Sequence, residues 1–424
     1  MKRIQLATCI MAISVPAMAY GYGEGADIPE GSRVIHLLTN EARTNTRDAL
    51  ADCGSNCSEG NSCHKEVMTP LYWDDGLFRA AQFHAAMLNG IDQSAQTPCM
   101  QHDSPCKLKS DIASTFPDKC DGTPSCACEG GNATCGNSGT SIWDRIKLFA
   151  DGGSAENLAS TSKKPYDAFI MWLYEDGKGD GCDSSSNNGH RFNILGDSKN
   201  VGVGYTTARA GKWYGIASQD FSRATPKETP ALTAGAGYQD DTNLWFKTHY
   251  YSDTAVSKVT VTIDGVKTEL SKTRGTDKNG VFGSKDIAAP NACTPYYFEA
   301  TDTSGKVTRF PTTGALLYNC NSSWMSIDNG GGDNNGGGDN NGGGDNNGGG
   351  DNNGGSDNNG GSDNNGGNNN NGGSDNNNSD EDSSGSDSGC SSNLHHTTHH
   401  APFALFGLLG IGGILLRRRK SSCI

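Results

Sequence analysis

Cysteine is the residue type with the clearest chemistry in this sequence, and it occurs 15 times in 424 residues. So many thiols do not suit a reducing cytosol unless they bind metal, and no pair of C-x-x-C motifs has zinc-ribbon spacing. Cys9, Cys390 and Cys423 lie in terminal segments, which leaves an even number, 12. We therefore predict six disulfides in an exported protein, with Cys293 paired to Cys320, the two cysteines of the C-terminal globular region.

The usual sequence motifs of hydrolytic enzymes are missing. The sequence contains neither H-E-x-x-H, the helical motif of many zinc peptidases, nor G-x-S-x-G, which positions a nucleophilic serine. No serine or cysteine stands in a pattern that identifies an activated nucleophile. The sequence motifs therefore favour binding over catalysis.

The aspartates are concentrated in one repetitive segment. Residues 328–388 repeat Asp-Asn-Asn-Gly-Gly-Gly/Ser and hold 11 Asp and one Glu without any Lys or Arg, so they supply −12 of the net charge of −14. The remainder is nearly neutral, which argues against nucleic-acid binding through a basic face. Calcium-binding rolls also space aspartates regularly, but they need an apolar residue in each repeat, and these repeats have none. We predict a disordered spacer over residues 327–388.

The N-terminal residues have the pattern of an export signal. Met1-Lys2-Arg3 precedes an apolar run, and Ala17-Met18-Ala19 is an A-x-A cleavage site. We predict a signal peptide over residues 1–19, with processing at Ala19.

The C-terminal residues have the pattern of a second targeting signal. Residues 401–416 form an apolar run, and Arg417-Arg418-Arg419-Lys420 follows directly, which predicts a short membrane span with a cytoplasmic basic end. Together with Gly389-Cys390, residues 389–424 resemble the bacterial sorting signals of the MYXO-CTERM class. That resemblance implies that Cys390 is the processing and lipid-attachment point. The alternative is a plain tail anchor.

Between these ends, residues 30–224 show helical and strand periodicity. Apolar residues at helical spacing predict helices that begin at Ser32, at Asp74-Asp75 and at Pro165. Residues 201–205 and 213–219 read as two strands joined by a hairpin. This pattern predicts an α+β fold with α-β-α layering.

Residues 236–326 have the pattern of an all-β domain, and a linker over residues 225–235 precedes them. Val259, Val261 and Ile263 alternate with threonines before the turn at Asp264-Gly265. We predict an immunoglobulin-like β-sandwich. The aromatic residues Trp245, Tyr250 and Tyr251 would suit a glycan if they were exposed, but packing within the domain is the interpretation that we favour.

Five motifs of the first region resemble those of the CAP superfamily of cysteine-rich secretory proteins, antigens and pathogenesis-related proteins. They follow the family's order across residues 32–222, and the resemblance implies an α-β-α sandwich in an extracellular protein. The motifs are Leu71-Tyr72-Trp73-Asp74 with Ala80-Ala81-Gln82-Phe83-His84-Ala85, Ala155-Glu156-Asn157-Leu158, Gly189-His190-Arg191-Phe192-Asn193-Ile194-Leu195, Val201-Gly202-Val203-Gly204 and Gln219-Asp220-Phe221.

The resemblance also implies a cleft tetrad of His102, Glu156, Glu175 and His190. His84 is the alternative to His102. Many bacterial members of the family have serine at the position of Glu175. Two neutral imidazoles, His102 and His190, could hold a divalent cation such as zinc, with the carboxylates as ligands or outer partners. The alternative is a structural hydrogen-bond network.

Residues 103–139 depart from the family as a Cys-rich insertion that begins beside His102. Their apolar content is too low for folding by burial alone, so we expect disulfides to hold them. Cys126-Ala127-Cys128 could chelate metal, but oxidised pairing is the interpretation that suits an exported protein.

Together these patterns predict an exported, surface-tethered protein that acts by binding. The resemblance implies a lipid, a sterol or a surface macromolecule as the ligand, and the C-terminal signal implies a membrane. The alternatives are a metal-dependent hydrolase acting on peptide or cell-wall material, and a structural adhesin.

Overall fold

The structure is a computed structural model. It describes residues 25, 28–51, 53, 57, 63–91, 100–116, 127–129, 139–161, 164–175, 188–207, 215–240 and 243–325. The predicted signal peptide, the hairpin over residues 209–212, the spacer and the C-terminal signal with Cys390 lie outside these residues. No helix within the described ranges is both long enough and apolar enough to cross a membrane.

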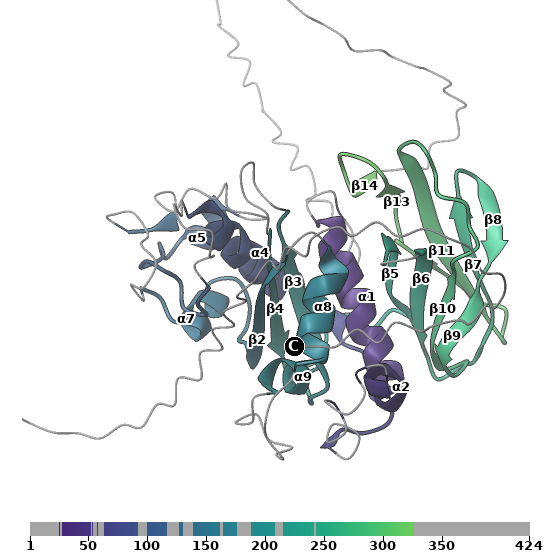
Figure 1. The fold of residues 1–424 in the computed structure, drawn as a ribbon, viewed down its shortest axis with the longest axis horizontal. Coiled ribbons are helices and arrows are strands. Elements are labelled where there is room, and N and C mark those ends of the chain that lie inside the picture. The colour runs from purple at the N-terminus through teal and green to yellow at the C-terminus, as the bar shows by residue number, and fades with distance from the viewer. Residues whose placement is uncertain are drawn as a thin grey trace, which may run out of the picture. The chain divides into compact units, whose positions relative to one another are not determined.

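The first part of the chain is built on a four-stranded sheet in the order β1-β3-β4-β2 (Figure 1). Its strands are β1 (Tyr72–Trp73), β2 (Ala155–Thr161), β3 (Asn200–Tyr205) and β4 (Gly215–Ser222). The short β1 runs parallel to β3, and the other pairs are antiparallel. The two predicted strands therefore form the centre of this sheet.

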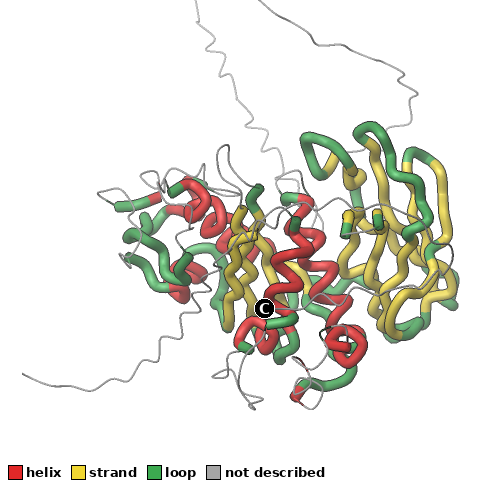
Figure 2. The backbone as a smooth tube through the Cα atoms, viewed as in Figure 1, coloured by secondary structure: helices red, strands yellow, loops and turns green. Residues whose placement is uncertain are grey.

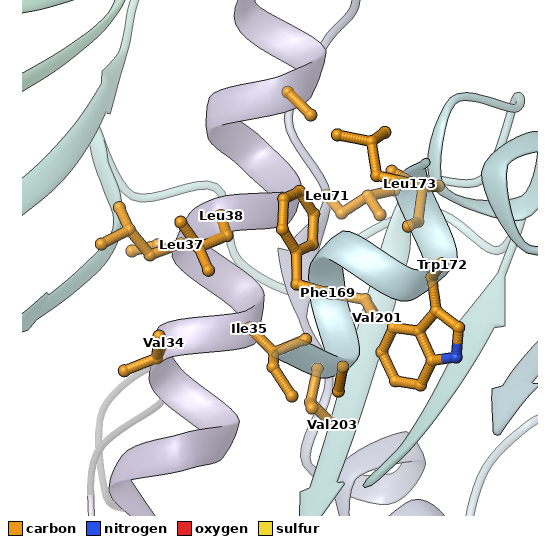
Figure 3. Close-up of a cluster of buried hydrophobic side chains, with 14 of the residues drawn as sticks. Val34, Ile35, Leu37, Leu38, Leu71, Phe169, Trp172, Leu173, Val201 and Val203 are labelled. Atoms are coloured by element: carbon orange, nitrogen blue, oxygen red, sulfur yellow. The ribbon is translucent and has the colours of Figure 1, made fainter. Parts of the chain in front are cut away.

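Helices cover both faces of this sheet. On one face lie α1 (Glu30–Thr44) and α8 (Pro165–Leu173), whose apolar side chains share a core with Val201 and Val203 of β3 (Figure 3). On the other face lies α4 (Asp75–Gly90), whose backbone closely approaches β3, since a Cβ at Gly202 or Gly204 would overlap backbone atoms of α4. The predicted α-β-α layering of an α+β fold is therefore present.

Local sequence signals explain where these helices begin. The Asp74 side chain accepts a hydrogen bond from the Leu77 backbone N–H at 2.9 Å and so caps α4. Pro165 occupies the first turn of α8, where a missing N–H costs nothing. The shorter helices are α2 (Thr46–Ala51), α5 (Ile112–Thr115), α7 (Ile142–Lys147) and α9 (Gly189–Ile194).

The second part of the chain consists of strands in two antiparallel sheets (Figure 2). The two sheets share one apolar core. One sheet has the order β5-β6-β10-β9, and the other has the order β14-β13-β11-β7-β8 with β12 paired to β11. The strands are β5 (Leu232–Gln239), β6 (Leu244–Tyr251), β7 (Val256–Ile263), β8 (Val266–Glu269), β9 (Ser271–Gly275), β10 (Asn279–Ser284), β11 (Thr294–Asp302), β12 (Val307–Phe310), β13 (Ala315–Tyr318) and β14 (Trp324–Met325).

Several predictions for this part are confirmed. Val259 and Val261 of β7 point into the core, and the turn that follows has Asp264 and Gly265 at φ values of 48° and 76°. Tyr250 is buried, so its ring packs rather than binds. The indole N–H of the half-buried Trp245 donates to the Asp240 carboxylate at 2.7 Å. Packing is therefore the role of these two aromatic residues.

The boundary between the two parts differs from the predicted linker. The strand β5 begins at Leu232, inside the segment 225–235 that we predicted as a linker. Ala234, Ala236 and Tyr238 of β5 share a continuous core with α1, while Leu232 faces the core between the two β-sheets. The sequence pattern missed this because a strand with Gly and Ala at alternate positions has little apolar bulk. The two parts are therefore packed together through α1.

Buried polar side chains also join the two parts. Asn40 of α1 donates to Leu71 O at 3.0 Å, accepts from Leu71 N at 2.8 Å, and donates to Thr233 Oγ1 of β5 at 3.3 Å. Thr233 Oγ1 lies 2.7 Å from His249 Nδ1, and His249 Nε2 lies 3.0 Å from Asn279 Oδ1. Burial lowers the pKa of His249 to about 3, so this ring is neutral in the network at physiological pH.

The structure contains disulfides, as expected for the oxidised protein that the cysteine pattern predicts. Cys293 pairs with Cys320, as predicted, and Cys106 pairs with Cys128 within the described part of the insertion. A third bond joins Cys53 to Cys57. The insertion also contributes Leu108, Ile112 and Ala127 to a small apolar cluster against α4, which the low apolar content of residues 103–139 did not predict.

We expect Asn40→Ala to lower the free energy of unfolding by about 1–3 kcal/mol, because the buried N–H of Leu71 loses its partner, while Leu71 O keeps its contact with His36 Nε2. Asn40 joins α1 to β5, so both parts of the protein should lose stability together. Calorimetry should therefore still show one unfolding transition for both parts, at a lower temperature. The exposed Asn291→Ala is the matched control and should change stability by less than about 0.5 kcal/mol. Two separate transitions in the unsubstituted protein would contradict the shared core.

Candidate functional site

The fold brings the four predicted cleft residues together as two carboxylate–histidine pairs. His102 Nδ1 lies 2.8 Å from Glu156 Oε1, although the two residues come from a loop and from the start of β2. His190 Nδ1, at the start of α9, lies 2.9 Å from Glu175 Oε1, just beyond the end of α8. The side chains of His102 and His190 are 49% and 22% exposed, so solvent reaches both rings.

Glu156 is fully buried and is held by a buried arginine. Arg145 of α7 donates to Glu156 Oε2, and Ser218 Oγ of β4 donates to the same oxygen at 3.2 Å. Burial by itself would raise the pKa of Glu156, but the charge of Arg145, together with the hydrogen bond to His102, more than offsets this and holds the pKa below its usual range. Glu156 is therefore ionised at neutral pH, and its position is fixed.

A second buried carboxyl group, Asp220, faces Glu156. The two residues are directly opposite each other on the antiparallel strands β2 and β4, so their side chains lie on the same face of the sheet. Among the described residues, neither oxygen of Asp220 has a partner in good hydrogen-bond geometry. Burial first, and then the Glu156 charge, raise the pKa of Asp220 well above its ordinary value. A single negative charge on the pair, carried by Glu156 beside Arg145, is therefore the favoured state.

His84 of α4 lies beside this cluster but differs from His102. It is fully buried, and its Nε2 lies 2.9 Å from Gln101 O. Burial, followed by the charge of Arg145, lowers its pKa to about 3, so the ring is neutral. His102 is the half-exposed ring that touches Glu156, and His84 is a buried neighbour without access to a ligand.

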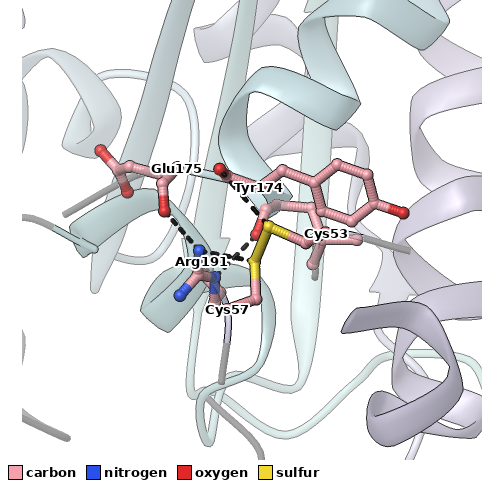
Figure 4. The surroundings of a disulfide bond; sticks show 6 residues. Cys53, Cys57, Tyr174, Glu175 and Arg191 are labelled. Atoms are coloured by element: carbon pink, nitrogen blue, oxygen red, sulfur yellow. Dashed lines mark hydrogen bonds between the residues drawn. A yellow bond between two sulfur atoms is a disulfide. The ribbon is translucent and has the colours of Figure 1, made fainter. Parts of the chain in front are cut away.

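Glu175 is positioned by the arginine of the G-H-R segment. Arg191 is buried, and its Nε donates to Leu173 O at 2.7 Å. Its Nη2 donates to Glu175 O and also contacts Cys57 Sγ at 3.1 Å (Figure 4). These bonds satisfy carbonyls at the C-terminus of α8, where a cation is favoured. The Glu175 carboxylate then accepts both the ring N–H and the backbone N–H of His190, the latter at 2.9 Å.

Two asparagines connect the pairs through β2. Asn157 Nδ2 donates to His190 O at 3.2 Å, and Asn193 Nδ2 donates to Glu156 O at 3.3 Å and to Asn157 Oδ1 at 2.9 Å. Within the described residues, no hydrogen bond or ion pair joins the side chains of one pair directly to those of the other. The site is therefore two oriented imidazoles on one hydrogen-bonded frame.

The chemistry of the site follows from the occupied ring nitrogens. A carboxylate accepts at Nδ1, so a neutral ring carries its proton there and presents the Nε2 lone pair. Such a nitrogen can accept a hydrogen bond or bind a cation, with the carboxylate as its outer partner. Within the described ranges, however, no group of three or more His, Cys, Asp or Glu residues could hold a metal ion. The zinc expectation for His102 and His190 stays a prediction.

Sequence reasoning did not identify Arg145 or Asp220 as parts of this site. Arg145 carried a usable signal, because it shares a helical stripe with Ile142 and Phe149, and a cation on an apolar stripe needs a buried partner. Asp220 belongs to the family-like motif Gln219-Asp220-Phe221, which predicted only a strand of the sheet. Its importance comes from the cross-strand register with Glu156, which the sequence pattern does not specify.

No protein-family model matches the chain, and the search of curated proteins finds no similar sequence.

We expect Arg145→Met to destabilise the protein by about 3–5 kcal/mol, because it leaves the Glu156 carboxylate buried without its guanidinium. Lys147→Ala in the same helix is the control, since it removes an exposed ion pair with Asp144 and should cost less than about 0.5 kcal/mol. Urea denaturation at neutral pH measures both values. Equal effects of the two substitutions would show that the buried pair adds nothing.

Asp220→Asn should stabilise the protein increasingly as the pH rises from about 4 to 7. The unfolded chain releases the Asp220 proton near its ordinary pKa of about 3.9, whereas the folded protein retains it, so rising pH favours unfolding of the unsubstituted protein. Glu156 acts in the opposite sense, since its stabilisation is present above its unfolded pKa and is lost in acid. Urea unfolding at several pH values measures the difference, and a pH-independent difference would contradict a protonated Asp220.

Proposed function

We propose that this chain is an exported, surface-tethered protein that acts by binding, and that its first part is a CAP-like domain. The support for the CAP-like assignment is that residues of separate motifs meet at one site. Glu156 and His190 belong to two of the five family-like motifs, and their partners are His102 and Glu175. Helices cover both faces of the sheet that carries Glu156.

The remaining parts of the proposal rest on the second region and on the cysteines. Two antiparallel sheets over one core support an immunoglobulin-like sandwich as the second domain. The disulfides support export, and the terminal sequence patterns support a signal peptide and a C-terminal tether. Processing at Ala19 and at Cys390 belongs to the same proposal.

The observation that carries the binding function is the form of the two histidine pairs. Both rings are oriented by a carboxylate and are open to solvent. No serine, threonine or cysteine side chain in the described ranges is hydrogen-bonded to either ring, so neither imidazole is placed to activate a nucleophile. Oriented rings without a nucleophile suit recognition of a ligand.

A surface macromolecule is the ligand class that this chemistry favours. A neutral imidazole Nε2 accepts a hydrogen bond from a hydroxyl or an amide N–H, both of which glycans and peptides present in abundance. A lipid or sterol would instead require an apolar groove beside the pairs. A divalent cation such as zinc on His102 and His190 would complete its coordination with water or with the ligand.

A metal-dependent hydrolase is the second candidate, and one observation favours it. His102 is half-exposed while its Nδ1 is held by the buried Glu156, an arrangement that also orients the general base of many enzymes. Such an enzyme would have to activate a water molecule directly or on a bound cation. A structural adhesin would use neither pair.

Native mass spectrometry of the protein isolated from its own envelope without chelators tests the proposal. We expect a bound molecule in the unsubstituted protein, with an occupancy about tenfold lower in the His102→Ala/His190→Ala variant, since the variant loses two neutral hydrogen bonds that are each worth about 0.5–1.5 kcal/mol. Lys107→Ala, which removes an exposed ion pair with Glu129, is the control.

Each alternative has its own result in this experiment. Equal occupancy in the double variant would contradict the cleft as the binding site. Cleavage of peptide or cell-wall fragments that disappears in the double variant would favour the hydrolase. Metal content measured on the same samples shows whether a cation is lost together with the rings.

A further inference from the structure

A cavity of about 600 Å³ lies where the two parts of the protein meet. Its wall comes from five segments: Tyr72 of β1, residues 229–231 before β5, residues 251–253 at the end of β6, residues 306–309 at the start of β12, and Thr312 after β12. The volume falls within the range of small-molecule sites in proteins, about 300–1,000 Å³. Because Tyr72 belongs to the first sheet, the complete wall exists only when the two parts are packed together.

The wall of this cavity is mainly polar. Hydroxyl groups come from Thr229, Ser252 and Thr308, a carboxylate from Asp253 and an ammonium group from Lys306. Sites for lipids and sterols are lined predominantly by apolar side chains, so such ligands do not suit this cavity. A ligand rich in hydroxyl groups could instead form hydrogen bonds with the hydroxyl groups, the carboxylate and the ammonium group of the wall.

Two tyrosines add aromatic surface to the same wall. Tyr72 is 9% exposed and Tyr251 is half-buried. Burial, and after it the proximity of Tyr251 and Asp253, raise the pKa of Tyr72 to about 12, so its phenol remains a hydrogen-bond donor at neutral pH. Phenol rings combine an apolar face with a polar hydroxyl, which matches the C–H face and the hydroxyl edge of a sugar ring.

The charges in the wall argue against an acidic ligand. Arg309 donates to Pro311 O at 3.0 Å and to Gly314 O at 2.6 Å, and its guanidinium lies 4.1 Å from the centre of the Tyr297 ring. Its fork therefore holds the local backbone and is not free to grip a carboxylate in bidentate fashion. Lys306 and Asp253 have opposite charges, which balance each other.

We propose that this cavity is a binding site for a neutral saccharide. Asp253 accepts hydrogen bonds from sugar hydroxyls, Lys306 and the neighbouring hydroxyl groups complete the polar contacts, and Tyr251 packs against the sugar ring. The site is separate from the two histidine pairs and does not depend on their function.

Isothermal titration of the full exported chain with cellotetraose, maltotetraose and tetra-N-acetylchitotetraose tests this site, with tetragalacturonate as an acidic comparison. At least one neutral tetrasaccharide should bind. Asp253→Ala and Lys306→Ala should each raise its Kd at least about tenfold, and both residues are exposed, so folding should persist. Asp286→Ala removes an exposed carboxylate of the same domain outside the cavity and should leave the Kd unchanged.

The His102→Ala/His190→Ala variant separates this site from the function proposed for the histidine pairs. It should bind the same neutral tetrasaccharide with unchanged Kd. Binding that persists in Asp253→Ala, or that is lost only in the histidine variant, would overturn the proposal. So would binding of tetragalacturonate alone, or no binding of any neutral tetrasaccharide at millimolar concentration.

Discussion

The structure depends on the burial of α1 on two sides. This helix packs against the first sheet and α8 on one side and against β5 on the other, so 13 of its 15 residues are buried. Seven of these buried residues are polar or charged, and a buried polar group is costly when it has no partner. Asn40 and His36 have such a partner in Leu71, and Asn40 also reaches Thr233. The constraint makes the two parts of the chain one packed unit.

The same helix helps to position the histidine pairs. Arg43 is buried in the last turn of α1 and donates to Ile194 O at 2.7 Å and to Gly196 O at 2.9 Å. These carbonyls follow His190 at the end of α9, where a cation offsets the partial negative charge of the helix terminus. Arg191 acts similarly at the end of α8. Two buried arginines thus fix the segments that carry His190 and Glu175.

Electrostatics around Glu156 distinguish the site from a simple surface pair. One buried guanidinium, Arg145, faces two buried carboxyl groups, and a medium of low polarity favours only one negative charge there. Glu156 takes the charge because it contacts Arg145, while Asp220 keeps its proton. The ionised Glu156 then holds the half-exposed ring of His102 in one orientation. The buried ion pair therefore fixes the orientation of a ring that is open to solvent.

Much of the fold was accessible from the sequence because its signals are local. The caps and turns at Asp74, Pro165 and Asp264-Gly265, and the alternation along β7, act over a few residues, and the structure has them where the pattern predicted. The pairing of Cys293 with Cys320 was predictable because no other cysteine lies in that part of the chain. The four cleft residues were named from motif resemblance.

Only the tertiary structure decided how these pieces combine. The register that sets Asp220 opposite Glu156, and the docking of Arg145 onto that pair, depend on contacts between segments far apart in the chain. The start of β5 within the predicted linker could not be predicted from the sequence. The Gly and Ala residues of that strand allow close packing against α1 and the facing sheet, but they give no strong apolar periodicity. The sequence by itself determined the local elements, their order and the candidate residues. Long-range packing decided their partners, their charge states and the cavity between the two parts, because those depend on which surfaces exclude water from one another.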